Sequence, residues 1–284
     1  MPSPRFIGLA LVPLALASTA TAALSAPTLR NSIAPHRAVY DISLKRTEEG
    51  SGVSSASGRM VFEVTGSSCE GYRMRQRMLV NIGDEDGNVG LLDFRISTFE
   101  SGDGDVYNFD SRTTLNQEVV ETVEGEARRH GSKIEVSLTQ PAKKIVEFDS
   151  AVLFPSQHMQ AIIDAALANR KVLTANIYEG AGSGDASDAA TAAIGGVKPV
   201  GVEAPLRKGV RAWPVSVGYF EHADESDDAA GEEGLGEELP SYQMSFTLYE
   251  NGVTNDLVMD YGKYALAGTL QTIEPLAKTN CTLR

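Results

Sequence analysis

The sequence is poor in cysteine and histidine, and this shortage excludes several kinds of site. It holds two cysteines and four histidines in 284 residues. Two cysteines cannot build a cysteine-only zinc site, and no C-x-x-C redox motif occurs. The histidines stand far apart, without the H-x-x-x-H or H-E-x-x-H spacing of metal sites. We therefore expect no metal and no cofactor.

The motifs of common hydrolases are missing as well. The segment 180–184 (GAGSG) places its serine one position too late for G-x-S-x-G, and no lysine has a serine three positions before it. A Ser-His-Asp arrangement that forms only in space leaves no such signature. We expect a protein that is not an enzyme, with an unrecognised hydrolase as a remote alternative.

A calcium loop is suggested by one acidic segment but lacks its key residues. Asp84 opens the run DEDGN, which begins like an EF-hand loop. Val89 stands where that loop needs glycine, and Arg95 stands where it needs glutamate. A hairpin turn is the better interpretation.

Basic residues are outnumbered by acidic ones, 25 to 38, and the net charge is −13. Nine of the acidic residues lie in 221–240, which has no lysine or arginine, so the rest of the chain carries only −4. There is no basic surface to replace the counterions of phosphates, which excludes a nucleic-acid partner. The sequence assigns no role to this acidic segment.

Long hydrophobic runs are also absent. The apolar run 6–17 follows a short basic start and precedes the A-x-A sequence at 20–22, an arrangement typical of a secretion signal. It is too short to cross a bilayer, which takes about 20 apolar residues. We predict a cleaved signal peptide, 1–22, and a periplasmic mature chain, 23–284, that forms a single domain and does not span a membrane.

Export would place both cysteines in an oxidising compartment. Two cysteines allow one intramolecular pairing, Cys69 with Cys281, and this disulfide is our prediction. Closing a loop of about 210 residues is worth roughly 5 kcal/mol in the chain-entropy treatment. The bond would fix the C-terminus to an early strand. Two unpaired thiols or a redox couple are the alternatives.

Most of the remaining sequence alternates with the period of β-strands. In the segment 72–82, apolar residues with Gln76 share one face, while Arg73, Arg75 and Arg77 share the other. Asn-Gly and Asp-Gly pairs between such segments favour hairpins and therefore antiparallel neighbours. The predicted strands are 39–46, 59–65, 72–82, 89–99, 105–109, 117–129, 133–138, 144–149, 172–178, 197–203, 212–221, 242–249, 254–261 and 264–273.

One segment, 156–169, has helical periodicity. Met159, Ile162, Ile163 and Ala166 fall on one stripe of that helix. A single amphipathic helix among strands predicts that it covers the concave face of a curved sheet or plugs a barrel. We expect a mainly β protein in which one large antiparallel curved sheet, a β-spiral or open barrel, surrounds this helix. The segments 180–196 and 222–239 are predicted to be flexible loops, because they cannot bury much apolar surface.

Two groups of residues are candidates for ligand binding. His158, near the start of the helix, could contact a ligand or sense pH, or could simply be hydrogen-bonded between helix and sheet. The arginines at 73, 75 and 77 could bind anionic lipid or peptidoglycan, or could pair with Glu118, Glu124 or Glu126 on another strand. Methionines and arginines on opposite faces of one strand are also compatible with an apolar cleft rimmed by charge.

Several segments together resemble a known family. They are HRAVYD at 36–41, CEGY at 69–72, FPSQH at 154–158, YENGV at 249–253, LVMDYG at 257–262 and the late cysteine at 281. Their order and spacing are similar to those of the EipB-type cell envelope integrity proteins of the alphaproteobacterial periplasm. The resemblance implies an open β-spiral around a helix, a disulfide between Cys69 and Cys281, a role in maintaining the envelope and no known enzymatic activity.

The expected function is therefore binding or scaffolding in the cell envelope, through envelope proteins or peptidoglycan-associated partners. The alternative is a periplasmic carrier that holds a lipid or lipoprotein acyl chain in a groove between sheet and helix. A carrier needs an apolar pocket of several hundred Å³, whereas a scaffold needs an exposed surface patch.

Overall fold

A computed structural model describes residues 33–199, 204–220 and 239–279. The described part forms one antiparallel sheet of fourteen strands, strongly curved but not closed, and a single helix. The predicted fold class is thus confirmed. The predicted signal peptide, residues 221–238 of the acidic segment and Cys281 lie outside the described residues. The elements are β1 (His36–Thr47), β2 (Ser55–Ser67), β3 (Gly71–Gly83), β4 (Val89–Glu100), β5 (Val106–Leu115), β6 (Glu118–His130), β7 (Lys133–Gln140), β8 (Lys144–Asp149), α1 (Pro155–Leu167), β9 (Val172–Ile177), β10 (Asp188–Ile194), β11 (Ala212–Phe220), β12 (Tyr242–Tyr249), β13 (Thr254–Asp260) and β14 (Tyr264–Pro275).

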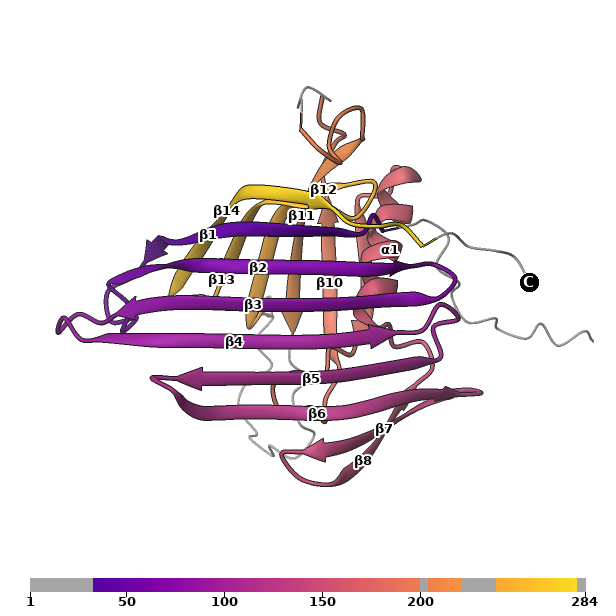
Figure 1. Ribbon diagram of the computed structural model, residues 1–284, viewed down its shortest axis with the longest axis horizontal. Coiled ribbons are helices and arrows are strands. Elements are labelled where there is room, and N and C mark those ends of the chain that lie inside the picture. Colours follow the sequence, from indigo (N-terminus) through magenta and orange to yellow (C-terminus); the bar gives the residue numbers. More distant parts are fainter. Residues whose placement is uncertain (1–32, 200–203, 221–238, 280–284) are drawn as a thin grey trace, which may run out of the picture.

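The order of strands explains the shape. Strands β1 to β8 form a meander, α1 follows, and β9 to β14 form a second meander whose last strand pairs with β1. Strands β8 and β9, which flank the helix in sequence, are therefore the two edges of the sheet. Figure 1 shows the two meanders facing one another, with α1 near one end of the enclosed space.

The two edges of the sheet are not joined by a continuous ladder of backbone hydrogen bonds. A single β-bridge and a cluster of packed aromatic side chains hold them together. Leu153 forms a single parallel bridge with Ile177, at the end of β9. Buried aromatic rings from β5, from the start of α1 and from the segment after β9 pack beside this bridge; they are Tyr107, Phe109, Phe154 and Tyr178. Gly180, with φ +65°, leaves no room for a side chain because a Cβ there would meet the Phe109 ring at 2.4 Å. The packing of this segment therefore requires glycine.

The helix begins and ends as its sequence predicts. Pro155 occupies the first helical position, where a missing N–H costs nothing. Asn169, just past the end, has φ +57°, and the N–H of Arg170 donates to the carbonyl of Ala165. This is the left-handed ending that asparagine tolerates.

One prediction in the second half of the chain is wrong, and a second can be checked only in part. Part of the predicted flexible loop 180–196 is strand β10, and its Ala190 and Ala192 are fully buried. Alanine favours strands weakly, but its small side chain allows α1 to lie close above β10. Of the predicted strand 197–203, the described residues form only an isolated bridge between Lys198 and Ala212.

Candidate functional site

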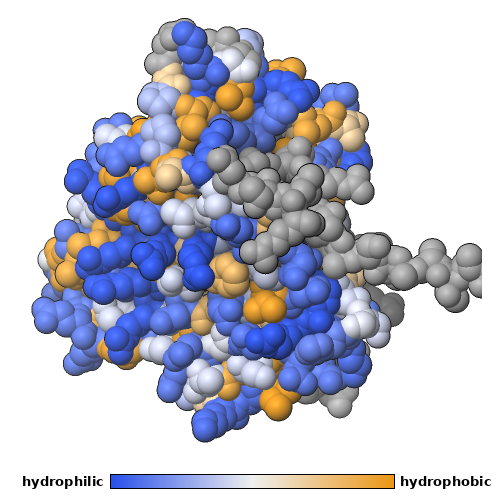
Figure 2. Space-filling view, turned by 45° about the vertical axis from the view of Figure 1, so that its right-hand side comes forward, coloured by the Kyte–Doolittle hydropathy of each residue, from blue (hydrophilic) through white to orange (hydrophobic). Residues whose placement is uncertain are grey.

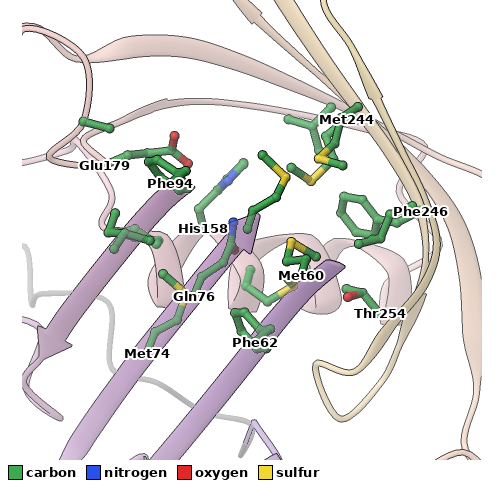
Figure 3. A pocket seen from close by; sticks show the side chains of 18 of the residues that line it. Met60, Phe62, Met74, Gln76, Phe94, His158, Glu179, Met244, Phe246 and Thr254 are labelled. Atoms are coloured by element: carbon green, nitrogen blue, oxygen red, sulfur yellow. The ribbon is translucent and has the colours of Figure 1, made fainter. Parts of the chain in front are cut away.

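A cavity of about 480 Å³ lies between the concave face of the sheet and α1. This volume is in the range of small-molecule sites. Apolar side chains from both meanders and from the helix dominate its lining, and Figure 3 shows them converging from opposite walls. The alternation in segment 72–82 is compatible with this apolar cleft, but the arginines expected at its rim do not line it.

Methionine is the characteristic residue of this cavity. Every methionine of the chain except Met1 lines it: Met60, Met74, Met78, Met159, Met244 and Met259. Methionine is unbranched and polarisable, so it adapts to irregular or variable apolar partners. A cavity lined in this way suits a flexible apolar ligand better than a rigid one.

A row of tyrosines follows β11 to β14 beside the methionines. Successive ring centroids of Tyr219, Tyr242, Tyr261 and Tyr264 are 5.5, 5.0 and 5.0 Å apart. Burial raises the pKa of each hydroxyl, that of Tyr261 to about 12. The row is therefore uncharged at physiological pH, and three of its members, Tyr219, Tyr242 and Tyr261, line the cavity without adding charge.

His158 lies on the first turn of α1 and borders the cavity (Figure 3). Its side chain is buried, and its Nε2 has no hydrogen-bond partner among the described residues. Burial lowers the pKa of the imidazole to about 4, so the ring is neutral at pH 7. The described residues therefore show no hydrogen bond from Nε2 to the sheet, and a ligand-contacting role for His158 stays a prediction.

Glu179 is the single carboxylate among the described residues that line the cavity, and no motif in the sequence pointed to it. Burial raises its pKa to about 7, and the nearby Asp188 adds to this effect. Tyr107, Tyr219 and Tyr242 are the other titratable groups that interact with its charge. No lysine or arginine lines the cavity in the described part of the chain.

Because the pKa of Glu179 is higher in the folded protein than its ordinary value of 4.5, folding favours the protonated acid. Its contribution to stability is present below pH 4.5 and is lost as the pH rises through about 7. The unfolding free energy of the wild type should therefore fall as the pH rises between these values. In Glu179→Gln this fall should be smaller, by on the order of 1 kcal/mol for each unit by which the pKa of Glu179 is raised. Urea unfolding at a series of pH values measures this, with the exposed Glu118→Gln on β6 as control. An unchanged slope in Glu179→Gln would contradict the assignment.

A second buried carboxylate, Glu100 at the end of β4, has a structural role. Its oxygens accept hydrogen bonds from the backbone N–H groups of Ser156 (2.8 Å) and Gln157 (3.1 Å) at the start of α1. Burial raises its pKa to about 7, although these bonds and the charge of Arg129 oppose the shift. Glu100 thus caps the helix from a distant strand and fixes His158 relative to the sheet. Sequence patterns near the helix could not reveal this cap.

The arginines at 73, 75 and 77 lie on the outer face of β3, away from the cavity. This outer surface is mainly hydrophilic on the side shown in Figure 2. Arg77 pairs with Asp93 of the adjacent strand β4 at 2.8 Å, and Arg73 lies over the ring of Phe99 at 4.5 Å. The predicted pairing with glutamates 118, 124 and 126 is wrong, because those residues are on β6, and β4 and β5 lie between. A ligand-binding role for these arginines stays a prediction.

Neither a metal site nor a membrane-spanning helix is found in the described residues. They contain no group of three or more metal-ligating side chains. No helix among them is long and apolar enough to cross a membrane. Asp84 instead closes the β3–β4 hairpin, where its carboxylate accepts from the backbone N–H groups of Asp86 and Asn88.

The curved sheet, the enclosed helix and the methionine-lined cavity define a β-barrel-like protein with an internal apolar site. The chain belongs to the EipB-like family, whose model matches residues 28–277. It is 32% identical, over 91% of its length and 89% of the relative's, to the cell envelope integrity protein EipB of Brucella abortus. It is also similar to the crystal structure of a beta-barrel-like protein of a domain of unknown function from Brucella abortus. That match has 30% identity and a TM-score of 0.78, and covers 86% of this chain and 99% of the other. The family resemblance found in the sequence is confirmed.

Proposed function

We propose that this protein supports the integrity of the cell envelope, without enzymatic activity, by holding an acyl chain in the cavity between sheet and helix. The observation that carries the proposal is the apolar cavity of about 480 Å³, to which six methionines contribute. The name of the relative from Brucella abortus supports the envelope role. The predicted secretion signal supports a periplasmic site of action.

An acyl chain fits the physical character of this cavity. Transfer of an acyl chain from water to this apolar cavity is favourable by about 0.8 kcal/mol for each CH₂ group. Flexible methionine side chains can adjust to chains of different length. The cavity therefore supports a carrier better than a scaffold. The scaffolding role expected from the sequence stays a prediction.

Binding of an uncharged fluorophore tests the proposal. The mature chain should bind N-phenyl-1-naphthylamine with enhanced fluorescence, and acyl compounds should displace it. Met74→Trp, which fills the cavity from β3, should weaken binding about tenfold or more, since methylenes forced back into water cost roughly 0.8 kcal/mol each. Asn81→Trp is the matched control, because Asn81 is exposed on the opposite face of the same strand.

The two variants separate cavity binding from adsorption to the surface. Equal affinities of Met74→Trp and the wild type, with both proteins folded by circular dichroism, would refute a site in this cavity. Failure of every acyl compound to displace the probe would refute the acyl ligand itself.

A further inference from the structure

The wall of the cavity is mainly apolar, and the polar groups on it include no cation among the described residues. The described lining residues offer one carboxylate, one imidazole, the carboxamide of Gln76 and several hydroxyls, but no lysine or arginine. An anionic headgroup drawn into such a cavity would lose its hydration without gaining a cation. Glu179, which lines the same cavity, would add repulsion when it is ionised. The lining therefore discriminates against carboxylates and phosphates.

His158 supplies what the methionines cannot, a free hydrogen-bonding atom inside the cavity. The residue is only 6% exposed, and its Nε2 lacks a partner among the described residues. Buried polar atoms are nearly always paired in folded proteins, so an unpaired one beside a cavity points to a ligand atom. The ring is neutral at pH 7, and with its proton on Nε2 it donates one hydrogen bond.

The position of His158 is fixed, which a specific contact requires. The helix that carries it is held at its N-terminus by Glu100, and Gln157 accepts a hydrogen bond from the N–H of Phe154 through its side-chain oxygen at 3.1 Å. In Figure 3 the imidazole lies among the methionine side chains, between the Glu179 and Met244 sides of the cavity. A ligand carbonyl at Nε2 would thus have apolar surface close by for its chain.

We propose that the cavity selects uncharged acyl esters, and that His158 Nε2 donates a hydrogen bond to the ester carbonyl while the methionines contact the chain. This inference rests on the proposed function and specifies its ligand class. It distinguishes an esterified chain, such as that of a glyceride or a lipid-modified protein, from a free fatty acid.

Displacement of N-phenyl-1-naphthylamine by three compounds of equal chain length tests the inference at pH 8, with the full mature chain. Methyl laurate should bind about fivefold more tightly than dodecane, the difference that one net hydrogen bond supports. Laurate, which is an anion at this pH, should bind most weakly. His158→Phe should lose the preference for the ester while it keeps its affinity for dodecane.

A conservative variant shows whether loss of the ester preference comes from loss of the hydrogen-bond donor or from a change in local packing. Glutamine places an amide N–H at a reach similar to that of the histidine Nε2, so His158→Gln should retain most of the preference for methyl laurate. Equal binding of methyl laurate and dodecane by the wild type, or binding of laurate as tight as that of the ester, would overturn the inference and leave the acyl-binding proposal intact. Displacement by none of the three would instead refute the proposed function.

Discussion

In oxidised protein, Cys69→Ser is expected to lower the free energy of unfolding by about 2–5 kcal/mol, the range typical when a native disulfide is removed from a small secreted domain. For a chain of this size the melting temperature should fall by roughly 4–20 °C. The reason is that the bond to Cys281 would restrict the unfolded chain far more than the folded one. Thermal unfolding without reductant, followed by circular dichroism, measures the difference.

The register of the sheet makes the bond feasible. His36 of β1 is opposite both Val64 of β2 and Pro275 of β14, so β2 and β14 flank the same end of β1. Across β1 these two strands are about 10 Å apart. Cys69 follows β2 in the turn to β3, and the six residues from the end of β14 to Cys281 can span about 20 Å. Cys281 is outside the described residues, so the bond stays a prediction.

Three comparisons check this prediction. Cys281→Ser and the double variant should melt at the same temperature as Cys69→Ser, because each removes the same single bond. With reductant present, wild type and variants should agree. If the oxidised wild type melted at the same temperature as Cys69→Ser, the predicted disulfide would be excluded.

Phe154→Ala should have a similarly large effect, with a loss of about 3–5 kcal/mol of unfolding free energy. The Phe154 ring is fully buried and stacks on Tyr107 at a centroid distance of 5.0 Å, with an interplanar angle of 20°. It belongs to the aromatic cluster beside the Leu153–Ile177 bridge, where the two edges of the sheet meet. Chemical denaturation gives the loss, and hydrogen exchange should show faster opening of β8 and β9 than of β1.

Tyr178→Phe is the matched control in this cluster. It keeps the ring and removes a hydroxyl that donates to the carbonyl of Gly184 at 2.7 Å. Loss of one such bond should cost about 1 kcal/mol. Equal losses in the two variants would mean that the cluster depends on this hydrogen bond rather than on the packing of Phe154.

Local sequence patterns were sufficient to predict regular secondary structure and the face on which each side chain lies. The alternation around Met74 and Met78 correctly separated the cavity face of β3 from its arginine face, and the helical stripe around Ile162 correctly located α1. Strand β10 escaped prediction because two of its three buried residues, Ala190 and Ala192, are alanines, which favour strands only weakly. The partners of the arginines were mispredicted because pairing depends on which strands are neighbours, and alternation within one strand contains no such information.

The sequence by itself determined the antiparallel β class, the single helix and the family, because each of these is written in short-range periodicity or in ordered motifs. It also placed His158 at the start of the helix. Only the tertiary structure decided that six methionines, far apart in the chain, meet with His158 and Glu179 around one cavity. The physical reason is the return of β14 to β1, which curls the sheet and brings the inner faces of both meanders together. Burial within that curve leaves the imidazole neutral, and no lysine or arginine is among the described residues that line the cavity. These two properties define the ligand that we propose.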